Sequence, residues 1–251
     1  MTERFSFEVV DAADYDELRP GYAWEAVQWV VERGRLGPGS VVVDLAAGTG
    51  QLSRLLAPLE LDVVAVEPAP NMRAVIEERL PSTRPIDGTA EDLPMADRSV
   101  DGVVVGNAFH HFEREAAYSE IRRVLRPAAP LALFWAWPLE EEQLATPGMR
   151  EIYDAVEETQ AASGIGMAYR RWAERPPREE GLGPWERREF RLTHVLPAAR
   201  LADLWGTSSD VASLPPPQRD ELLGRIRRLS EDLPEMLRLP SRTVVDLCAK
   251  D

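Results

Sequence analysis

The segment formed by residues 41–52 constrains the fold of this chain more than any other part of the sequence. Its first five residues, Val-Val-Val-Asp-Leu, follow the pair Pro38-Gly39, and a turn of small residues occupies positions 46–50. A β-branched run after Pro-Gly is typical of a buried strand, and a helical pattern starts at Gln51. Small residues let the backbone approach a ligand, and a helix start offers free N–H donors. The segment therefore predicts a strand, a ligand-binding turn and a helix.

Strand and helix patterns continue to alternate along the first half of the chain. Strands that are apolar on both faces and alternate with helices predict an α/β protein, with a parallel sheet covered by helices on both sides. Asn71 is expected to cap the helix after the second strand. Strands are predicted at residues 41–45, 62–66, 84–87, 100–105, 131–137, 187–196 and 242–249. Helices are predicted at residues 51–59, 71–80, 113–125, 149–159, 197–206 and 217–229.

We expect a single domain, residues 1–251, with a helical insertion in its second half. The insertion holds no convincing strand, and its Tyr153, Met167, Tyr169 and Trp172 form either a lid over a ligand or the surface of a helix pair. Arg170 and Arg171 would suit an acidic ligand or simply be solvated. The expected parts are an N-terminal lid with the first helix (1–35), a cofactor-binding core (40–137), the insertion (139–186), and C-terminal strands and helices (187–251).

Composition excludes several classes of protein. The formal net charge is −14, which disfavours a sequence-independent grip on nucleic acid or docking on anionic lipid. The single cysteine, Cys248, rules out an internal disulfide framework and a multi-cysteine metal site. The three histidines are too few and too irregularly spaced for a usual zinc site, so no metal is expected. The sequence shows no long apolar span and no apolar leader at its start. We therefore expect a cytoplasmic protein, a monomer or a homodimer.

Glu67 indicates which ligand the turn binds. It ends the second predicted strand, 19 residues after Gly48, where a carboxylate can accept hydrogen bonds from both hydroxyls of a ribose. The dinucleotide pattern Gly-x-Gly-x-x-Gly would need a third glycine at Ser53, and the triphosphate loop needs a lysine that this segment lacks. The pattern therefore predicts an adenosine site and disfavours a dinucleotide oxidoreductase.

Five motifs in order resemble class I S-adenosylmethionine-dependent methyltransferases. They are the glycine loop at 43–50, the ribose-binding strand end at 65–68, the loop at 88–94, the fourth strand at 99–105, and the segment 123–127 ahead of the fifth strand. The loop at 88–94, with Thr89, Ala90 and Glu91, resembles the one that binds the adenine amine in that family. The resemblance implies a Rossmann-like, doubly wound, mostly parallel seven-stranded sheet with an antiparallel last strand. It implies S-adenosylmethionine as cofactor and S-adenosylhomocysteine as product. The cofactor-binding residues it implies are Tyr15, Arg19, Asp44, Ala46, Gly48, Gly50, Glu67, Pro68, Met72, Thr89, Ala90, Glu91 and Asn107.

A narrower resemblance is to the small-molecule branch that includes trans-aconitate methyltransferase-like proteins. It rests on residues 15–22 near the N-terminus and on residues 107–112 after the fourth strand. In that branch the N-terminal Tyr/Arg segment closes over the cofactor, and an acidic protein also needs a local cation for the cofactor carboxylate. The acceptor-site residues that we assign are Tyr22, Phe109 and Trp135, with His110 and His111 as candidate catalytic residues.

Three departures from the family pattern bear on function. Ala46 replaces the first glycine of the loop, Ala128-Ala129 replaces a Gly-Gly pair, and His111 replaces a tryptophan. Ala46 either has a positive φ, which would cost about 1–2 kcal/mol, or adopts an ordinary backbone angle.

We expect methyl transfer to a small acid, phenol or amine, and histidine is a suitable base because it titrates near neutral pH. The alternative is a methyltransferase fold that binds the same cofactor but catalyses a cyclisation or an isomerisation. His110 either acts as a base or only shapes the pocket, and His194 is expected to be a core histidine.

Overall fold

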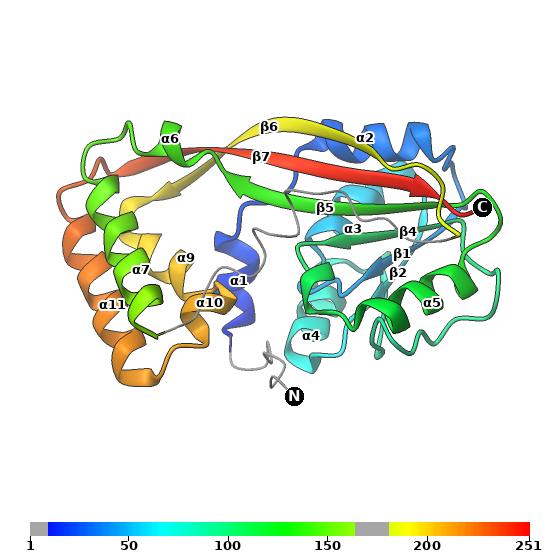
Figure 1. Cartoon of the computed structure of the whole chain (residues 1–251), viewed down its shortest axis with the longest axis horizontal. Helices are drawn as coiled ribbons and strands as arrows, with labels where there is room; N and C mark the ends of the chain where they lie inside the picture. The colour runs from blue at the N-terminus through cyan, green and yellow to red at the C-terminus, as the bar shows by residue number, and fades with distance from the viewer. Residues whose placement is uncertain (1–9, 164–180) are drawn as a thin grey trace. The chain divides into compact units, whose positions relative to one another are not determined.

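The computed structural model describes residues 10–163 and 181–251, and its central element is a seven-stranded sheet (Figure 1). The strand order is β3-β2-β1-β4-β5-β7-β6, and β1 pairs in parallel with both β2 and β4. The arrow of β7 points opposite to that of β5 in Figure 1, so the last strand is antiparallel. The strands are β1 Val41–Leu45, β2 Asp62–Val66, β3 Arg84–Ile86, β4 Gly102–Gly106, β5 Pro130–Pro138, β6 Glu186–Pro197 and β7 Met236–Ala249.

Helices connect the strands. The α-helices are α1 Ala12–Leu18, α2 Trp24–Arg33, α3 Gln51–Leu56, α4 Pro70–Arg79, α5 Arg114–Val124, α6 Glu140–Gln143, α7 Met149–Ser163, α9 Leu201–Gly206, α10 Ser209–Ala212 and α11 Pro216–Ser230. Short 3₁₀ helices are η2 Ala57–Leu59, η3 Phe109–His111 and η4 Ala198–Arg200. The crossovers between parallel strands place the site where β1, β2 and β4 end.

The predicted strands and the doubly wound fold are confirmed, with differences at the ends. β1 and β2 match their predicted ranges, whereas β7 begins six residues earlier than expected, at Met236. The prediction that Asn71 caps α4 is wrong, because the N-cap is Ala69 and Asn71 is already helical. Pro70 occupies the first helical position, where its fixed φ suits a helix start. The cap therefore lies two residues before Asn71, at Ala69.

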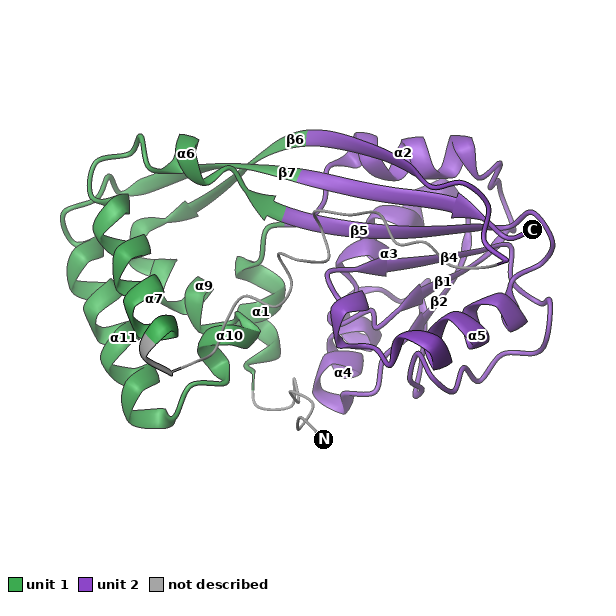
Figure 2. Ribbon diagram, viewed as in Figure 1, with its two compact units in different colours: residues 1–20, 137–168, 191–242 green, residues 21–136, 169–190, 243–251 purple. Residues whose placement is uncertain are grey.

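The described residues fall into two compact units, coloured separately in Figure 2. The first unit, which we call the sheet unit, consists of the described residues within 21–136, 169–190 and 243–251. The second, which we call the helical unit, consists of the described residues within 1–20, 137–168 and 191–242. The division falls inside β5, β6 and β7 and differs from the expected parts at 139–186 and 187–251; the expectation of one domain stays a prediction.

The sheet unit buries its apolar strands between helices. Val42, Val43 and Leu45 of β1 are fully enclosed. In β4, a Cβ on Gly102 would touch Leu36, and one on Gly106 would collide with Tyr22, so this face needs glycine for close approach. The buried carboxylate of Asp246 pairs with Arg187 through hydrogen bonds of 2.7 and 2.8 Å.

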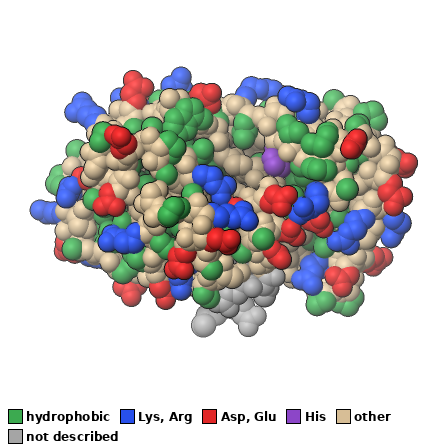
Figure 3. Space-filling view, turned by 180° about the vertical axis from the view of Figure 1, so that it is seen from behind, with side chains coloured by type: hydrophobic (Ala, Val, Ile, Leu, Met, Phe, Trp, Pro, Cys, Tyr) green, Lys and Arg blue, Asp and Glu red, His purple; other side chains and the backbone are tan. Residues whose placement is uncertain are grey.

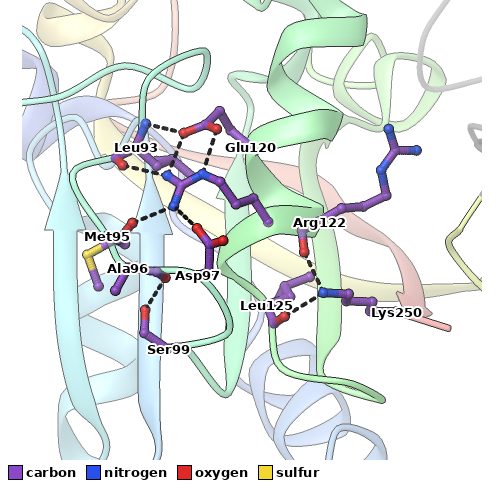
Figure 4. A network of polar contacts seen from close by, with 10 residues as sticks. Leu93, Met95, Ala96, Asp97, Ser99, Glu120, Arg122, Leu125 and Lys250 are labelled. Atoms are coloured by element: carbon purple, nitrogen blue, oxygen red, sulfur yellow. Dashed lines mark hydrogen bonds and ion pairs between the residues drawn. The ribbon is translucent and has the colours of Figure 1, made fainter.

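The end of α5 is fixed by Lys250, the one lysine in the sequence. Its Nζ donates to the backbone carbonyl oxygens of Arg122 at 2.6 Å and Leu125 at 2.8 Å, as Figure 4 shows. These carbonyls lie at the C-terminal end of the helix, where a cation is favoured by the helix dipole. Ala128, in the turn that follows, has a φ of 64°, in the left-handed region.

The helical unit has its own apolar core, built mainly from α7, α9, α11 and the helical-unit parts of β6 and β7. Tyr153 of α7 packs edge-on against Trp205 and donates a 2.6 Å hydrogen bond to Gln143. Arg200 joins this core to α1 through Asp14 at 2.6 Å and Glu17 at 3.3 Å. The other lid candidates lie outside the described residues: Met167, Tyr169, Arg170, Arg171 and Trp172. No helix in the described ranges has the length and apolar character needed to cross a membrane.

Candidate functional site

The glycine loop between β1 and α3 has a left-handed backbone at three positions. Ala46, Gly48 and Gly50 have φ angles of 54°, 56° and 83°. The ordinary-φ alternative for Ala46 is therefore ruled out, and its methyl group carries the conformational cost considered above. At Gly50 a Cβ would lie 2.7 Å from Leu80 Cδ1, so this glycine is required both by its φ and by packing on α4.

Asp44 fixes the start of α3 to the end of β1. Its Oδ2 accepts a hydrogen bond from the Ser53 backbone N–H at 2.9 Å and another from the Ser53 hydroxyl at 2.7 Å. Burial raises the pKa of the Asp44 carboxyl to about 6; the Ser53 hydrogen bonds oppose this shift, and the nearby charge of Glu67 adds to it. Asp44 is only 2% exposed, and all its hydrogen bonds in the described structure go to Ser53, so its observed role is to hold the loop.

Glu67 links the loop to the start of α4. Its Oε2 accepts from the Gly48 N–H and its Oε1 accepts from the Ala69 N–H, both at 2.9 Å. Burial raises the pKa of this carboxyl, while those two hydrogen bonds and the charge of Arg73 act in the opposite direction. Each carboxylate oxygen offers about two lone pairs, so each keeps one for a further donor. The arrangement can hold two hydroxyl groups of one ligand.

The loop after β3 contains the three residues predicted to bind adenine. It starts at Gly88, where a Cβ would lie 3.0 Å from Val66 Cγ1 and 2.8 Å from Pro94 Cδ, so the loop packs closely on the end of β2. Thr89 is exposed and Ala90 is 3% exposed. Glu91 Oε1 accepts a 2.8 Å hydrogen bond from the Glu113 N–H at the start of α5. The loop therefore lies next to the strand that carries Glu67.

The ends of β4 and β5 bring the histidines and one tryptophan together. The rings of His110 and His111 have centroids 3.8 Å apart, and the His110 and Trp135 ring centroids are 6.0 Å apart. Trp135 is 3% exposed, and its indole N–H has no hydrogen-bond partner within the described residues. Asn107, with a φ of 51°, accepts a 2.8 Å hydrogen bond from the Ala136 N–H, which fixes the two strand ends together.

Several predicted site residues pack in the interior. Met72 and Phe109 are each 1% exposed, and Phe109 contacts Phe112 and Tyr118 with ring centroids 5.3 and 4.9 Å apart. Tyr22 packs edge-on against Phe134 at 5.6 Å. These three side chains are therefore buried, whereas Pro68 is exposed, and their assigned contacts with cofactor or acceptor stay predictions.

Tyr15 and Arg19 belong to the helical unit, where the Arg19 guanidinium lies 5.4 Å from the Tyr15 ring centroid. Burial raises the pKa of Asp210, and Arg19 lowers it. His194 also belongs to this unit; burial lowers its pKa, and a hydrogen bond to the Leu18 backbone opposes that shift. His194 is half-buried, and it packs beside α1 as a structural residue.

Sequence reasoning missed three residues that hold the site together: Ser53, Glu120 and Arg123. Ser53 entered only as a missing glycine, yet it supplies both donors to Asp44. Glu120 and Arg123 bind the loop after β3 from α5. Their partners lie 26 to 30 residues away in sequence, so no local pattern reveals them. In the described ranges no three His, Cys, Asp or Glu side chains are grouped to hold a metal ion.

Comparison with known proteins identifies the class. A family model described as a methyltransferase domain matches residues 43–133, which include the glycine loop, Glu67 and the histidine pair. An uncharacterized methyltransferase of Mycobacterium tuberculosis is 34% identical over 235 residues, covering 92% of this chain and 90% of that protein. The chain therefore belongs to the S-adenosylmethionine-dependent methyltransferases and is an enzyme of that class, with S-adenosylmethionine as the implied cofactor.

Two further relatives add detail. The demethylmenaquinone methyltransferase of Thermotoga maritima is 37% identical over 101 residues, covering 39% of this chain and 44% of that protein. A solved structure from Anaeromyxobacter dehalogenans, assigned to the type II methyltransferases, superposes with a TM-score of 0.63 at 22% identity and covers 92% of this chain and 97% of that one. At that identity the structural match supports the fold alone.

Proposed function

We propose that this enzyme transfers the methyl group of S-adenosylmethionine to a small-molecule acceptor, by O- or N-methylation of a small acid, phenol or amine. The observation that carries the proposal is the Glu67 carboxylate, which holds the glycine loop and the start of α4 while keeping two acceptor positions free. The trans-aconitate methyltransferase-like branch and a cytoplasmic location remain parts of this proposal.

The described residues fit the cofactor. Glu67 would accept hydrogen bonds from the two ribose hydroxyls, and the left-handed backbone at Ala46, Gly48 and Gly50 keeps the loop free of side-chain bulk. Thr89, Ala90 and Glu91 would lie along the adenine. Tyr15 and Arg19 remain candidates for the methionine end.

The cofactor supplies an electrophilic methyl group on a sulfonium, so the protein needs to align the acceptor and exclude water more than to provide covalent catalysis. His110 would accept a proton from a phenol or an amine, and a carboxylate acceptor would need no base. Trp135 offers a buried N–H next to His110 and would donate to an oxygen atom of the acceptor.

Two observations support a small acceptor. On the face shown in Figure 3, arginine and lysine side chains are interspersed with aspartate and glutamate, so basic groups there are neighboured by acidic ones. The partial relative from Thermotoga maritima is named for demethylmenaquinone, a quinone and not a macromolecule. The cyclisation or isomerisation alternative is not favoured, because the relatives over the whole chain are methyltransferases.

Calorimetric titration tests the cofactor site directly. We expect the wild type to bind S-adenosylmethionine and S-adenosylhomocysteine with micromolar dissociation constants and to bind no NAD. Glu67→Gln places an amide N–H₂ against a backbone N–H, and we expect it to weaken S-adenosylhomocysteine binding about tenfold or more, which corresponds to about 1.4 kcal/mol per factor of ten.

Asp62→Asn is the matched control, because Asp62 is exposed at the opposite end of the same strand. We expect it to leave the affinity unchanged. If the wild type bound NAD and neither adenosyl ligand, the cofactor assignment would be wrong. A labelled methyl group that passes to no acceptor in a panel of small acids, phenols and amines would overturn the acceptor class.

A further inference from the structure

The loop after β3 is attached to α5 by side chains. Leu93 donates its backbone N–H to Glu120 Oε2 at 2.9 Å, and Figure 4 shows Leu93, Met95 and Asp97 gathered beside this helix. At the start of α5 the Glu113 N–H donates to Glu91. The loop is therefore held at two separate points along the same helix.

Arg123 makes the largest share of these contacts. Its Nε and Nη2 donate to the two carboxylate oxygens of Glu120 at 2.8 and 2.7 Å. Nη2 also donates to the Leu93 carbonyl at 2.9 Å, and Nη1 donates to the Met95 carbonyl at 2.7 Å and to Asp97 at 2.8 Å. A guanidinium has five N–H donors, and here every one of them has an acceptor.

Arg123 does more than form an ion pair at the surface. Two of its acceptors are backbone carbonyls of the loop, so the guanidinium fixes the path of the main chain. Glu120, from the same helix, accepts a hydrogen bond from the Leu93 N–H, and its hydrogen bonds with Arg123 lower the pKa of its carboxyl. A lysine at position 123 has a compact ammonium and lacks the planar fork needed to reach all these acceptors.

We propose that Arg123, oriented by Glu120, is the positioning residue that sets the adenine specificity of the enzyme. The inference rests on the proposed function, in which Thr89, Ala90 and Glu91 lie along the adenine. Arg123 itself touches no ligand. It holds residues 93–97, and through them it keeps the preceding residues in the conformation that recognises the 6-amino group.

The test compares two ligands that differ at that group and at the neighbouring N1. S-inosylhomocysteine carries an oxygen where S-adenosylhomocysteine has the 6-amino group, and its N1 carries a proton. The dissociation constant of the inosyl ligand divided by that of the adenosyl ligand therefore measures recognition of this edge of adenine. We expect the wild type to favour the adenosyl ligand at least about tenfold, because the inosyl ligand leaves polar groups of the site without matching partners. In Arg123→Gln we expect the ratio to fall to about one, mainly through weaker binding of the adenosyl ligand.

Arg126→Gln is the matched control. Arg126 lies three residues further on and also pairs with a carboxylate, that of Asp101, but it makes no hydrogen bond to the loop in the described structure. We expect its ratio to equal that of the wild type. Arg123→Lys and Glu120→Gln provide two milder changes if the glutamine variant does not fold, and both should lower the ratio part of the way.

Hydrogen exchange supplies a readout that needs no ligand. The Leu93 amide should exchange at least about tenfold faster in Arg123→Gln than in Arg126→Gln. A wild type that binds neither ligand would contradict the proposed function, whereas the exchange result would still stand. An unchanged ligand ratio in all Arg123 and Glu120 variants, with the wild type binding normally, would overturn the positioning role.

Discussion

The glycine loop and the loop after β3 lie at the ends of neighbouring parts of the sheet, yet they are held in different ways. The glycine loop depends on backbone conformation, with left-handed φ angles at Ala46, Gly48 and Gly50. The loop after β3 depends on the side chains of Glu120 and Arg123. The first is therefore sensitive to the size of a side chain, and the second to the removal of a charged hydrogen-bonding group.

The largest expected effect comes from adding one methyl group to the glycine loop. Gly50→Ala combines a positive φ with a Cβ only 2.7 Å from Leu80 Cδ1 and 3.1 Å from Ile76 Cγ1. We expect a loss of about 3–4 kcal/mol in the free energy of unfolding, measured by urea denaturation. We also expect S-adenosylhomocysteine binding to be lost.

Gly39→Ala is the control for the backbone alone. Gly39 has a similar φ of 79°, but a Cβ there would meet nothing within 4 Å. This variant should lose about 1–2 kcal/mol and bind the ligand normally. Equal losses in the two variants would mean that packing on α4 does not matter.

A smaller effect is expected from Asp44→Asn, and it depends on pH. The folded pKa of about 6 lies above the ordinary value of 3.8, so the folded protein holds the proton more tightly than the unfolded chain. Wild-type stability relative to the variant should therefore be greatest below about pH 4 and should fall by at most about 3 kcal/mol as the pH rises to about 6.

Urea unfolding of both proteins between pH 4 and 7.5 measures this difference and cancels the other titrating groups. Between about pH 6 and 7 the difference should fall by a further few tenths of a kcal/mol, and above about pH 7 it should be constant. An asparagine oxygen can still accept both Ser53 hydrogen bonds, so the loop should stay in place. A difference that does not vary with pH would show that Asp44 ionises normally.

The smallest expected effect is a gain. Ala46→Gly relieves a left-handed alanine, and we expect about 0.5–1 kcal/mol more stability in thermal or urea unfolding, together with tighter S-adenosylhomocysteine binding. Ala128→Gly, at a φ of 64° outside the loop, should give a similar gain in stability and no change in affinity. Tighter binding in both variants would argue against a specific role for the loop.

The sequence predicted the parts of the fold that depend on local patterns. The β-branched runs at residues 41–45 and 62–66 match β1 and β2, because Pro38-Gly39 precedes the first run and Glu67-Pro68 ends the second. The hydrogen bond from the Gly48 N–H to Glu67 was not predicted, although the two residues follow strands that are neighbours in the sheet.

Other features could not be predicted because they depend on contacts between distant residues. The φ of Ala46 is set by the loop as a whole, and the amino-acid type alone would suggest an ordinary angle. The five acceptors of Arg123 come from three separate parts of the loop and from one turn of helix. Phe109, in a motif expected near the acceptor, is buried and packs on Tyr118, a contact that the sequence alone did not indicate.

The position of Lys250 has a consequence for chemical labelling. Its ε-amine is the single lysine side chain that an acylating reagent or an acetyl donor can meet in this sequence. That amine is already occupied by the carbonyl oxygens of Arg122 and Leu125. Acylation would remove its charge and leave only one N–H donor at the end of α5, the helix that carries Arg123. A tag on this lysine would therefore weaken the support of α5 rather than modify a neutral surface site.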